Sequence, residues 1–213
     1  FNGTVQAASA FNVVGAGPAG GLTNGVNNNQ VGVTPTALSL GALGNYGGAT
    51  PTLPLLPGSP AINAGTNVSA PATDQRGIAR PAAVDVGAFE SRGFNLSIAG
   101  GSGQTAVIST PFATALSVNV APVAVGEPVQ GGTVSFTPPG AGASASLTTS
   151  PASINAGGVA SVTAVANATA GGYTVSANSA GNTGSALSFA LTNRLLSADL
   201  SITKTNGTTT STP

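Results

Sequence analysis

The chain has 213 residues, with five basic and five acidic side chains and a formal net charge of zero. It contains no His, Cys, Met or Trp, and charged residues make up 5% of it, against about 25% in ordinary proteins. We therefore expect no disulfide, metal, cofactor or catalytic activity. The chain has no basic stripe for nucleic-acid phosphates or anionic lipid, and no apolar run approaches the roughly 18 residues of a membrane span. We expect neither nucleic-acid binding nor membrane insertion.

Residues 1–50 consist of short apolar segments separated by Gly and Asn, such as "GTVQAASAFNVVG" and "GLTNGVNNNQVGV". Gly and Asn tolerate the positive φ angles of tight bends, and short strands with such corners are typical of a parallel β-helix. This segment predicts the terminal rungs of a truncated parallel β-helix. Because it begins at Phe1 inside what reads as a repeat, we expect the chain to be a piece of a longer polypeptide.

One apparent motif in this part is rejected. Gly15, Gly17 and Gly20 have the G-x-G-x-x-G spacing of a dinucleotide-binding turn. That chemistry needs a helix to begin at the third glycine and an acidic residue about 20 positions further on. The following "LTNGVNNNQVG" is a poor helix former, and the first carboxylate of the chain is Asp74. A glycine-rich corner of the β-helix is the better interpretation.

Residues 51–92 are rich in proline and irregular, and they predict a cap over the open end of the β-helix. This cap carries six of the ten charged residues of the chain, and they are Asp74, Arg76, Arg80, Asp85, Glu90 and Arg92. A catalytic interpretation would use Asp85 and Glu90 as a carboxylate pair acting on a glycan, but residues 1–73 supply no further acid for such a groove. We favour a structural ion cluster in which acids pair with arginines.

Residues 93–193 alternate apolar and polar positions with a period of two. In "ALSVNVA", Leu116, Val118 and Val120 share one face, and further apolar pairs occur in "TVSF", "GYTVSA" and "ALSFALT". Such strands, separated by Gly, Pro and Asn turns over about 100 residues, predict an immunoglobulin-like (Ig-like) β-sandwich. Tyr173 opens a late strand, where it serves either as a tyrosine corner or as an ordinary core aromatic. The fold class is therefore all-β.

Residues 194–213 add a spare strand and a linker. Leu200 and Ile202 alternate with Ser201 and Thr203, and "NGTTTSTP" follows. Leu200 and Ile202 are candidates for an inter-subunit strand, because an uncovered strand edge pairs with other chains.

Three parts of the sequence resemble known families. "NYGGATPT", "LLPGSPAINAG", "DQRG" and "DVGAFE", in this order, resemble the C-terminal end of secreted bacterial right-handed β-helix proteins of the choice-of-anchor or polymorphic outer-membrane type. "FATALSVNV" and "GVASVTAVANATAGGYTVSA" resemble Ig-like repeats of bacterial adhesins, although only Glu127 represents the acidic turn of that family. "ADLSITKT" resembles the first strand of a further surface-protein repeat. The resemblance implies display at the bacterial cell surface.

These observations predict a structural segment of an extracellular bacterial surface protein, an adhesin stalk or fibre. Its partners would be other copies of itself, in a head-to-tail filament formed by strand addition, or neighbouring modules of a longer chain. Host or matrix glycans are a further candidate partner. The alternative is a set of accessory domains of a carbohydrate-binding or polysaccharide-degrading β-helix protein.

Overall fold

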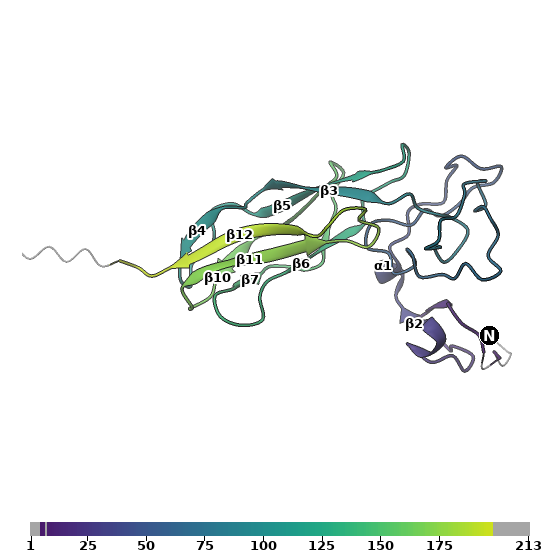
Figure 1. Cartoon of the computed structure of the whole chain (residues 1–213), viewed down its shortest axis with the longest axis horizontal. Coiled ribbons are helices and arrows are strands. Elements are labelled where there is room, and N and C mark those ends of the chain that lie inside the picture. Colours follow the sequence, from purple (N-terminus) through teal and green to yellow (C-terminus); the bar gives the residue numbers. More distant parts are fainter. Residues whose placement is uncertain (1–4, 7, 198–213) are drawn as a thin grey trace, which may run out of the picture.

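In the computed structural model, which describes residues 5, 6 and 8–197, the predicted all-β class is confirmed. The described helices are the 3₁₀ turn η1 (Val26–Asn28) and the single turn α1 (Pro35–Leu38). The helix α1 begins where Thr34 Oγ1 accepts a hydrogen bond from the Ala37 N–H, and it ends at Ser39, whose φ is 49°. Elongated sheets occupy one end of the molecule and irregular chain the other (Figure 1).

The sandwich is built from two principal sheets and one short pair. The strand orders are β3-β5-β9 in the first sheet, β4-β12-β11-β6-β8 in the second, and β10-β7 in the pair. All contacts between neighbouring strands are antiparallel except the parallel pair β12–β4. The bounds are β3 (Phe94–Gly100), β4 (Gln104–Val107), β5 (Leu116–Pro122), β6 (Thr133–Thr137), β7 (Ala145–Leu147), β8 (Ala152–Ser153), β9 (Val159–Val162), β10 (Ala164–Ala166), β11 (Gly171–Asn178) and β12 (Leu187–Arg194).

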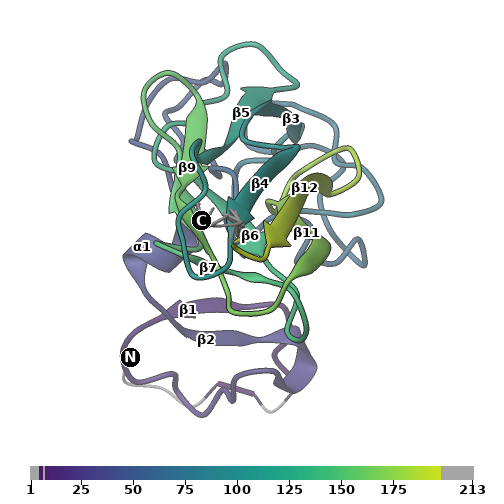
Figure 2. The same cartoon turned by 90° about the vertical axis from the view of Figure 1, so that its left-hand side faces the viewer.

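The period-two pattern correctly identifies the buried face of these strands. Leu116 and Val118 are fully buried and Val120 nearly so, whereas Asn119 between them is exposed. Phe136 of β6 and Phe189 of β12 meet in the same core, with ring centroids 5.9 Å apart. Both sheets contribute to one hydrophobic core, which they enclose when the molecule is seen along its length (Figure 2).

Tyr173 is half-buried and ties two strands and a loop together. Its hydroxyl donates to Asn193 Oδ1 at 3.1 Å, and the Asn193 amide donates to the carbonyls of Ser144 and Thr169. Asn193 is 1% exposed, so this amide replaces the water that those carbonyls would otherwise require. The hydroxyl therefore reaches loop carbonyls through a second side chain.

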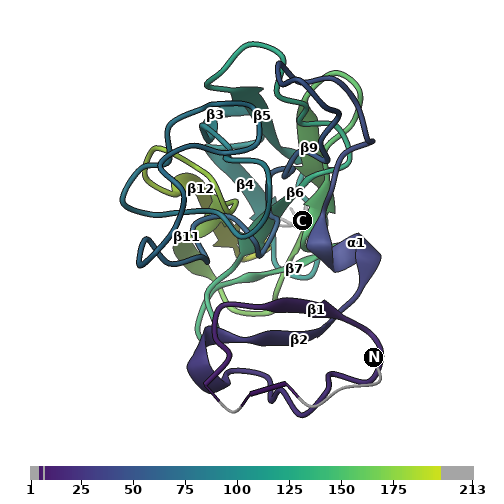
Figure 3. The same ribbon diagram turned by 90° about the vertical axis from the view of Figure 1, so that its right-hand side faces the viewer.

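Of the first 50 residues, those that the structure describes form one parallel pair of strands, β1 (Val13–Gly15) and β2 (Gln30–Val33). Buried Asn29 supports the corner before β2: its Oδ1 accepts from the Asn12 N–H, and its amide donates to the Ser9 carbonyl. The two strands lie side by side at one edge of the molecule in both end-on views (Figures 2 and 3). A parallel β-helix is not shown by this one pair, so the predicted rungs stay a prediction.

Residues 39–56 form a loose hairpin arm, in which Leu40 pairs with Leu55 and Gly44 with Thr52. The rest of the cap, residues 57–92, follows this arm and is joined to the sandwich by backbone hydrogen bonds. Gly58 N–H donates to the Ala180 carbonyl, and Thr133 N–H donates to the Pro57 carbonyl. Leu55, Ala61 and Ile62 belong to the same buried cluster as the sandwich residues, so the core does not break at residue 92. Leu200 and Ile202 lie outside the described residues.

The close packing between cap and sandwich predicts that a substitution of Gly181 lowers the stability of the protein. This residue has a φ of 83°, and a Cβ atom there would lie 2.9 Å from Phe94 Cδ2 and 3.1 Å from Ile62 Cδ1. Gly103 has a similar φ of 77° but open space around it. Gly103→Ala should lower the free energy of unfolding by about 1–2 kcal/mol, through backbone strain alone. Gly181→Ala should cost about 1–3 kcal/mol more, because it also overpacks the junction. Urea titrations measure both, and equal losses would refute the packing.

Candidate functional site

The sequence "DQRGI" folds into a tight loop around the Asp74 carboxylate. Asp74 Oδ1 accepts hydrogen bonds from the N–H groups of Arg76 at 2.8 Å and Ile78 at 3.0 Å. Asp74 N–H donates to the Ile78 carbonyl, and Gly77 supplies the positive φ of 82° that closes the turn. An Asp side chain that accepts backbone N–H bonds from following residues is a known turn former. The loop therefore holds the Asp74 carboxylate in one position inside the cap.

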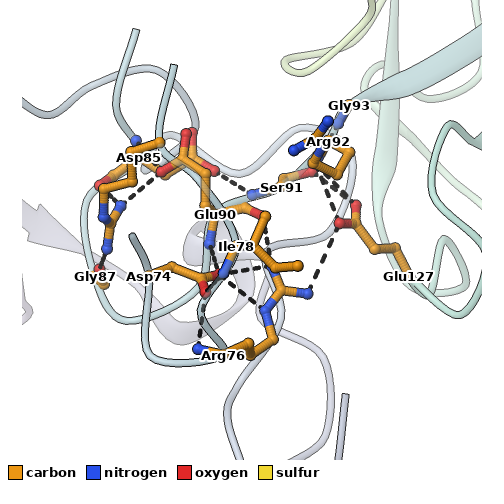
Figure 4. A network of polar contacts seen from close by, with 11 residues as sticks. Asp74, Arg76, Ile78, Asp85, Gly87, Glu90, Ser91, Arg92, Gly93 and Glu127 are labelled. Atoms are coloured by element: carbon orange, nitrogen blue, oxygen red, sulfur yellow. Dashed lines mark hydrogen bonds and ion pairs between the residues drawn. The ribbon is translucent and has the colours of Figure 1, made fainter. Parts of the chain in front are cut away.

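The Arg76 guanidinium bridges this loop to the end of the cap. It donates from Nε to Asp74 Oδ2 at 2.8 Å and from Nη2 to the Glu90 carbonyl at 2.6 Å, and it pairs with Asp74 through Nη2 at 2.7 Å. Its Cζ atom lies 3.5 Å from the centre of the Phe89 ring. Because the side chain is 5% exposed, this stacking and pairing occur largely away from water. Figure 4 shows the Arg76 guanidinium between the carboxylates of Asp74 and Glu127.

Arg80 and Glu90 form the second ion pair. Arg80 Nη1 lies 2.6 Å from Glu90 Oε2, and the same arginine donates to the carbonyls of Asp85 and Gly87. Both side chains are buried, with 8% and 1% exposure. Arg80 Nε and Glu90 Oε1 find no hydrogen-bond partner among the residues that the structure describes. The pair therefore depends on the single Nη1–Oε2 contact.

Asp85 makes no ion pair in the described structure; its carboxylate binds backbone. Oδ1 accepts from Asn63 N–H and Oδ2 from Ser91 N–H, each at 2.7 Å. Burial raises the pKa of Asp85 to about 6, because desolvation outweighs these two hydrogen bonds. Asp74 behaves in the opposite way: burial opposes its ionisation, but hydrogen bonds from Glu90 N–H and Arg76 bring its pKa below the ordinary value.

Glu127 also belongs to this cluster, and the charged stretch of residues 74–92 did not predict it. It lies in the loop between β5 and β6, and its carboxylate accepts from Arg92 N–H at 3.1 Å and from Ser91 Oγ at 3.1 Å. Arg76 Nη1 lies 4.0 Å from Glu127 Oε1. Burial raises the pKa of Glu127. Glu127 is the only acidic residue between positions 93 and 193, and that isolation was the signal in the sequence.

Five of the six predicted cluster residues are brought together, and they are Asp74, Arg76, Arg80, Asp85 and Glu90. Arg92 is different: its backbone N–H binds Glu127, but its side chain is exposed and makes no ion pair within the described residues. The carboxylates of Asp85 and Glu90 both accept backbone N–H groups from within the cap. This arrangement is suited to fixing an irregular backbone.

The glycine motif near β1 lacks the geometry for a phosphate site. The chain turns at Gly20 and Gly21, with φ angles of 62° and 98°, and the next helical element is the short η1. A pyrophosphate site of this kind needs a helix N-terminus at the third glycine.

Comparison of the chain with protein-family models, with curated proteins and with solved structures finds no match. Among the described residues, no set of three or more His, Cys, Asp or Glu side chains is placed to hold a metal ion. The same residues contain no helix with the length and apolar character for a membrane span.

Because Arg80 is in a buried ion pair and the Arg92 side chain is exposed, we expect their substitutions to lower the free energy of unfolding by different amounts. Arg80→Ala leaves the Glu90 carboxylate buried and unpaired, and it should lower the free energy of unfolding by about 3–5 kcal/mol. Arg92→Ala removes an exposed side chain and should cost no more than about 0.5 kcal/mol. Chemical denaturation compares the two variants. Similar losses would show that the Arg80–Glu90 contact contributes little.

The carboxyl groups also predict how stability depends on pH. Since the pKa of Asp85 is about 6 when folded and 3.8 ordinarily, the native state binds this proton more tightly than the unfolded state. The free energy of unfolding should therefore fall as the pH rises from about 4 to about 6, by an amount of the order of 1–3 kcal/mol. The lowered pKa of Asp74 acts oppositely, so its contribution is lost as the pH falls below about 4.

Thermal melting between pH 3 and pH 8 measures this dependence, and the absence of His simplifies it. The melting temperature should be highest near pH 4–5, and Asp85→Asn should flatten its decline toward pH 7. An undiminished decline in Asp85→Asn would show that Asp85 does not cause it.

Proposed function

We propose that the chain is a load-bearing structural segment of an extracellular surface protein, of the bacterial adhesin-stalk type that its sequence resembles. One observation carries the proposal: the described chain enters the sandwich at one end and leaves it at the other (Figure 1). β3 begins beside the cap, where Phe94 N–H donates to the Gly181 carbonyl, and β12 ends at Arg194 at the far end. Tension along the chain therefore passes through the sandwich lengthwise.

The parallel pair β4–β12 supports the proposal of a load-bearing sandwich. Its register runs from Gln104 opposite Leu191 to Val107 opposite Arg194, so both strands run toward the C-terminal end. Tension pulls β12 toward the C-terminal end, and it pulls β4 in the opposite direction through β3, which precedes β4 in the chain. The two parallel strands are thereby sheared past each other. In that geometry several ladder hydrogen bonds must break together, which is harder than breaking them one at a time.

The buried ion cluster supports the same role. Glu127 of the sandwich holds the backbone at Ser91 and Arg92, where the cap leads into β3. We propose that the cluster is structural, and that it fixes the cap against an Ig-like sandwich so that the two parts keep one orientation. A spacer of this kind bears tension and also keeps the parts at its two ends in a fixed relative orientation. Its partners would be further copies or neighbouring modules, joined head to tail.

Single-molecule pulling tests the mechanical role. The chain has no Cys, so one introduced cysteine gives a unique attachment point, with the second handle at the C-terminus. Arg92→Cys, directly before β3, loads β4–β12 in shear. Thr110→Cys, just beyond the C-terminal end of β4, instead opens the pair from one end, because Ile108 N–H bonds the Arg194 carbonyl there. We expect a clearly higher rupture force with Arg92→Cys. Equal forces would contradict a load-bearing sandwich.

A further inference from the structure

An apolar pocket of about 400 Å³ lies between β1, the hairpin arm and the end of the cap. Its walls include Val13, Leu40, Leu43, Leu53, Leu55 and Phe89. None of the side chains that line it is charged, and the polar ones are Thr52 and Gln75. Leu43 and Leu53 are 66% and 46% exposed at its rim. The volume lies in the range of binding pockets in proteins, and the lining favours an uncharged, aliphatic occupant.

The chain itself contains a segment of this chemistry. Residues 198–205, which we call the donor segment, carry Leu200 and Ile202 on one face when extended, about 7 Å apart, with Ser201 and Thr203 on the other. Two aliphatic side chains on one face match the aliphatic lining of the pocket.

The donor segment cannot reach the pocket of its own molecule. The cap contacts the sandwich at Ala180, whose carbonyl accepts from Gly58 N–H, before β12 begins at Leu187. Reaching back from the far end means passing the eight residues of β12, a distance of about 27 Å. From Ser197, the last described residue, Ile202 is five residues away and reaches at most about 17 Å. A donor segment that fills this pocket therefore comes from a second copy.

We propose that the pocket of one copy binds Leu200 and Ile202 of the next, giving head-to-tail association. The inference rests on the proposed structural function and names the contact that would join its units. The pocket is lined by the hairpin arm and the cap, whereas the donor segment follows β12, which ends at the opposite end of the sandwich, so the contact does not close on itself and each added copy presents a new pocket. The association therefore grows with concentration.

Sedimentation velocity of the 213-residue chain, from micromolar to millimolar concentration, tests the proposal with paired variants. The donor variant carries Leu200→Asn and Ile202→Asn, and the pocket variant carries Leu43→Asn and Leu53→Asn. Each should remain monomeric where the unaltered chain forms oligomers, since burial of one aliphatic side chain changes affinity by about tenfold or more. The control variant, Ser201→Asn with Thr203→Asn, changes the opposite face and should still assemble.

An equimolar mixture of the donor and pocket variants is the most specific arm. One retains an intact pocket and the other an intact donor segment, so the mixture should form a 1:1 heterodimer and stop there. Melting curves verify that the pocket variant is folded, as the exposure of Leu43 and Leu53 leads us to expect. Oligomers that survive either double substitution, or a control that fails to assemble, would overturn the proposal. A monomer at every concentration would also overturn it, whereas the pulling experiment judges the mechanical function separately.

Discussion

The buried carboxylates of the cap solve a hydrogen-bonding problem on which the rest of the structure depends. Between Pro57 and Gly93 the described chain contains no strand or helix, so its N–H groups lack the partners that a ladder would supply. Side-chain oxygens take their place. Asp74 accepts from the N–H groups of Arg76, Ile78 and Glu90, and Asp85 accepts from those of Asn63 and Ser91. An irregular segment is thereby given one conformation.

This arrangement explains why six of the ten charged residues of the chain lie between positions 74 and 92. A buried carboxylate is costly unless it is paired or well hydrogen-bonded, and here the two buried arginines also satisfy carbonyl groups of the same loops. Arg76 reaches the Glu90 carbonyl, and Arg80 reaches those of Asp85 and Gly87. Glu127 extends the network into the sandwich, where Ile62 of the cap also packs into the common core. Cap and sandwich are therefore joined by both polar and apolar contacts.

The sequence predicted those parts of the fold that follow from a local repeat. Alternation at Leu116, Val118 and Val120 identifies a buried strand face because side chains in a strand point to alternate sides. The cluster of charges was visible as a composition change, but its internal pairing was not, since the exposure of Arg92 and the reach of Glu127 are set by contacts far apart in sequence. The β-helix prediction rested on short Gly- and Asn-rich segments, which specify corners but not how many rungs stack.

Native-state hydrogen exchange tests most directly whether the buried carboxylates unite cap and sandwich. The informative amides are Asp85, Glu90 and Ser91 in the cap, whose acceptors are carboxylate oxygens, and Val118 in the middle of β5. If the carboxylates unite cap and sandwich, all four amides exchange through the same global opening, with equal free energies and equal sensitivity to added denaturant. Exchange of the three cap amides at a distinctly lower free energy than Val118 would show that the cap opens on its own and that the carboxylates do not unite it with the sandwich.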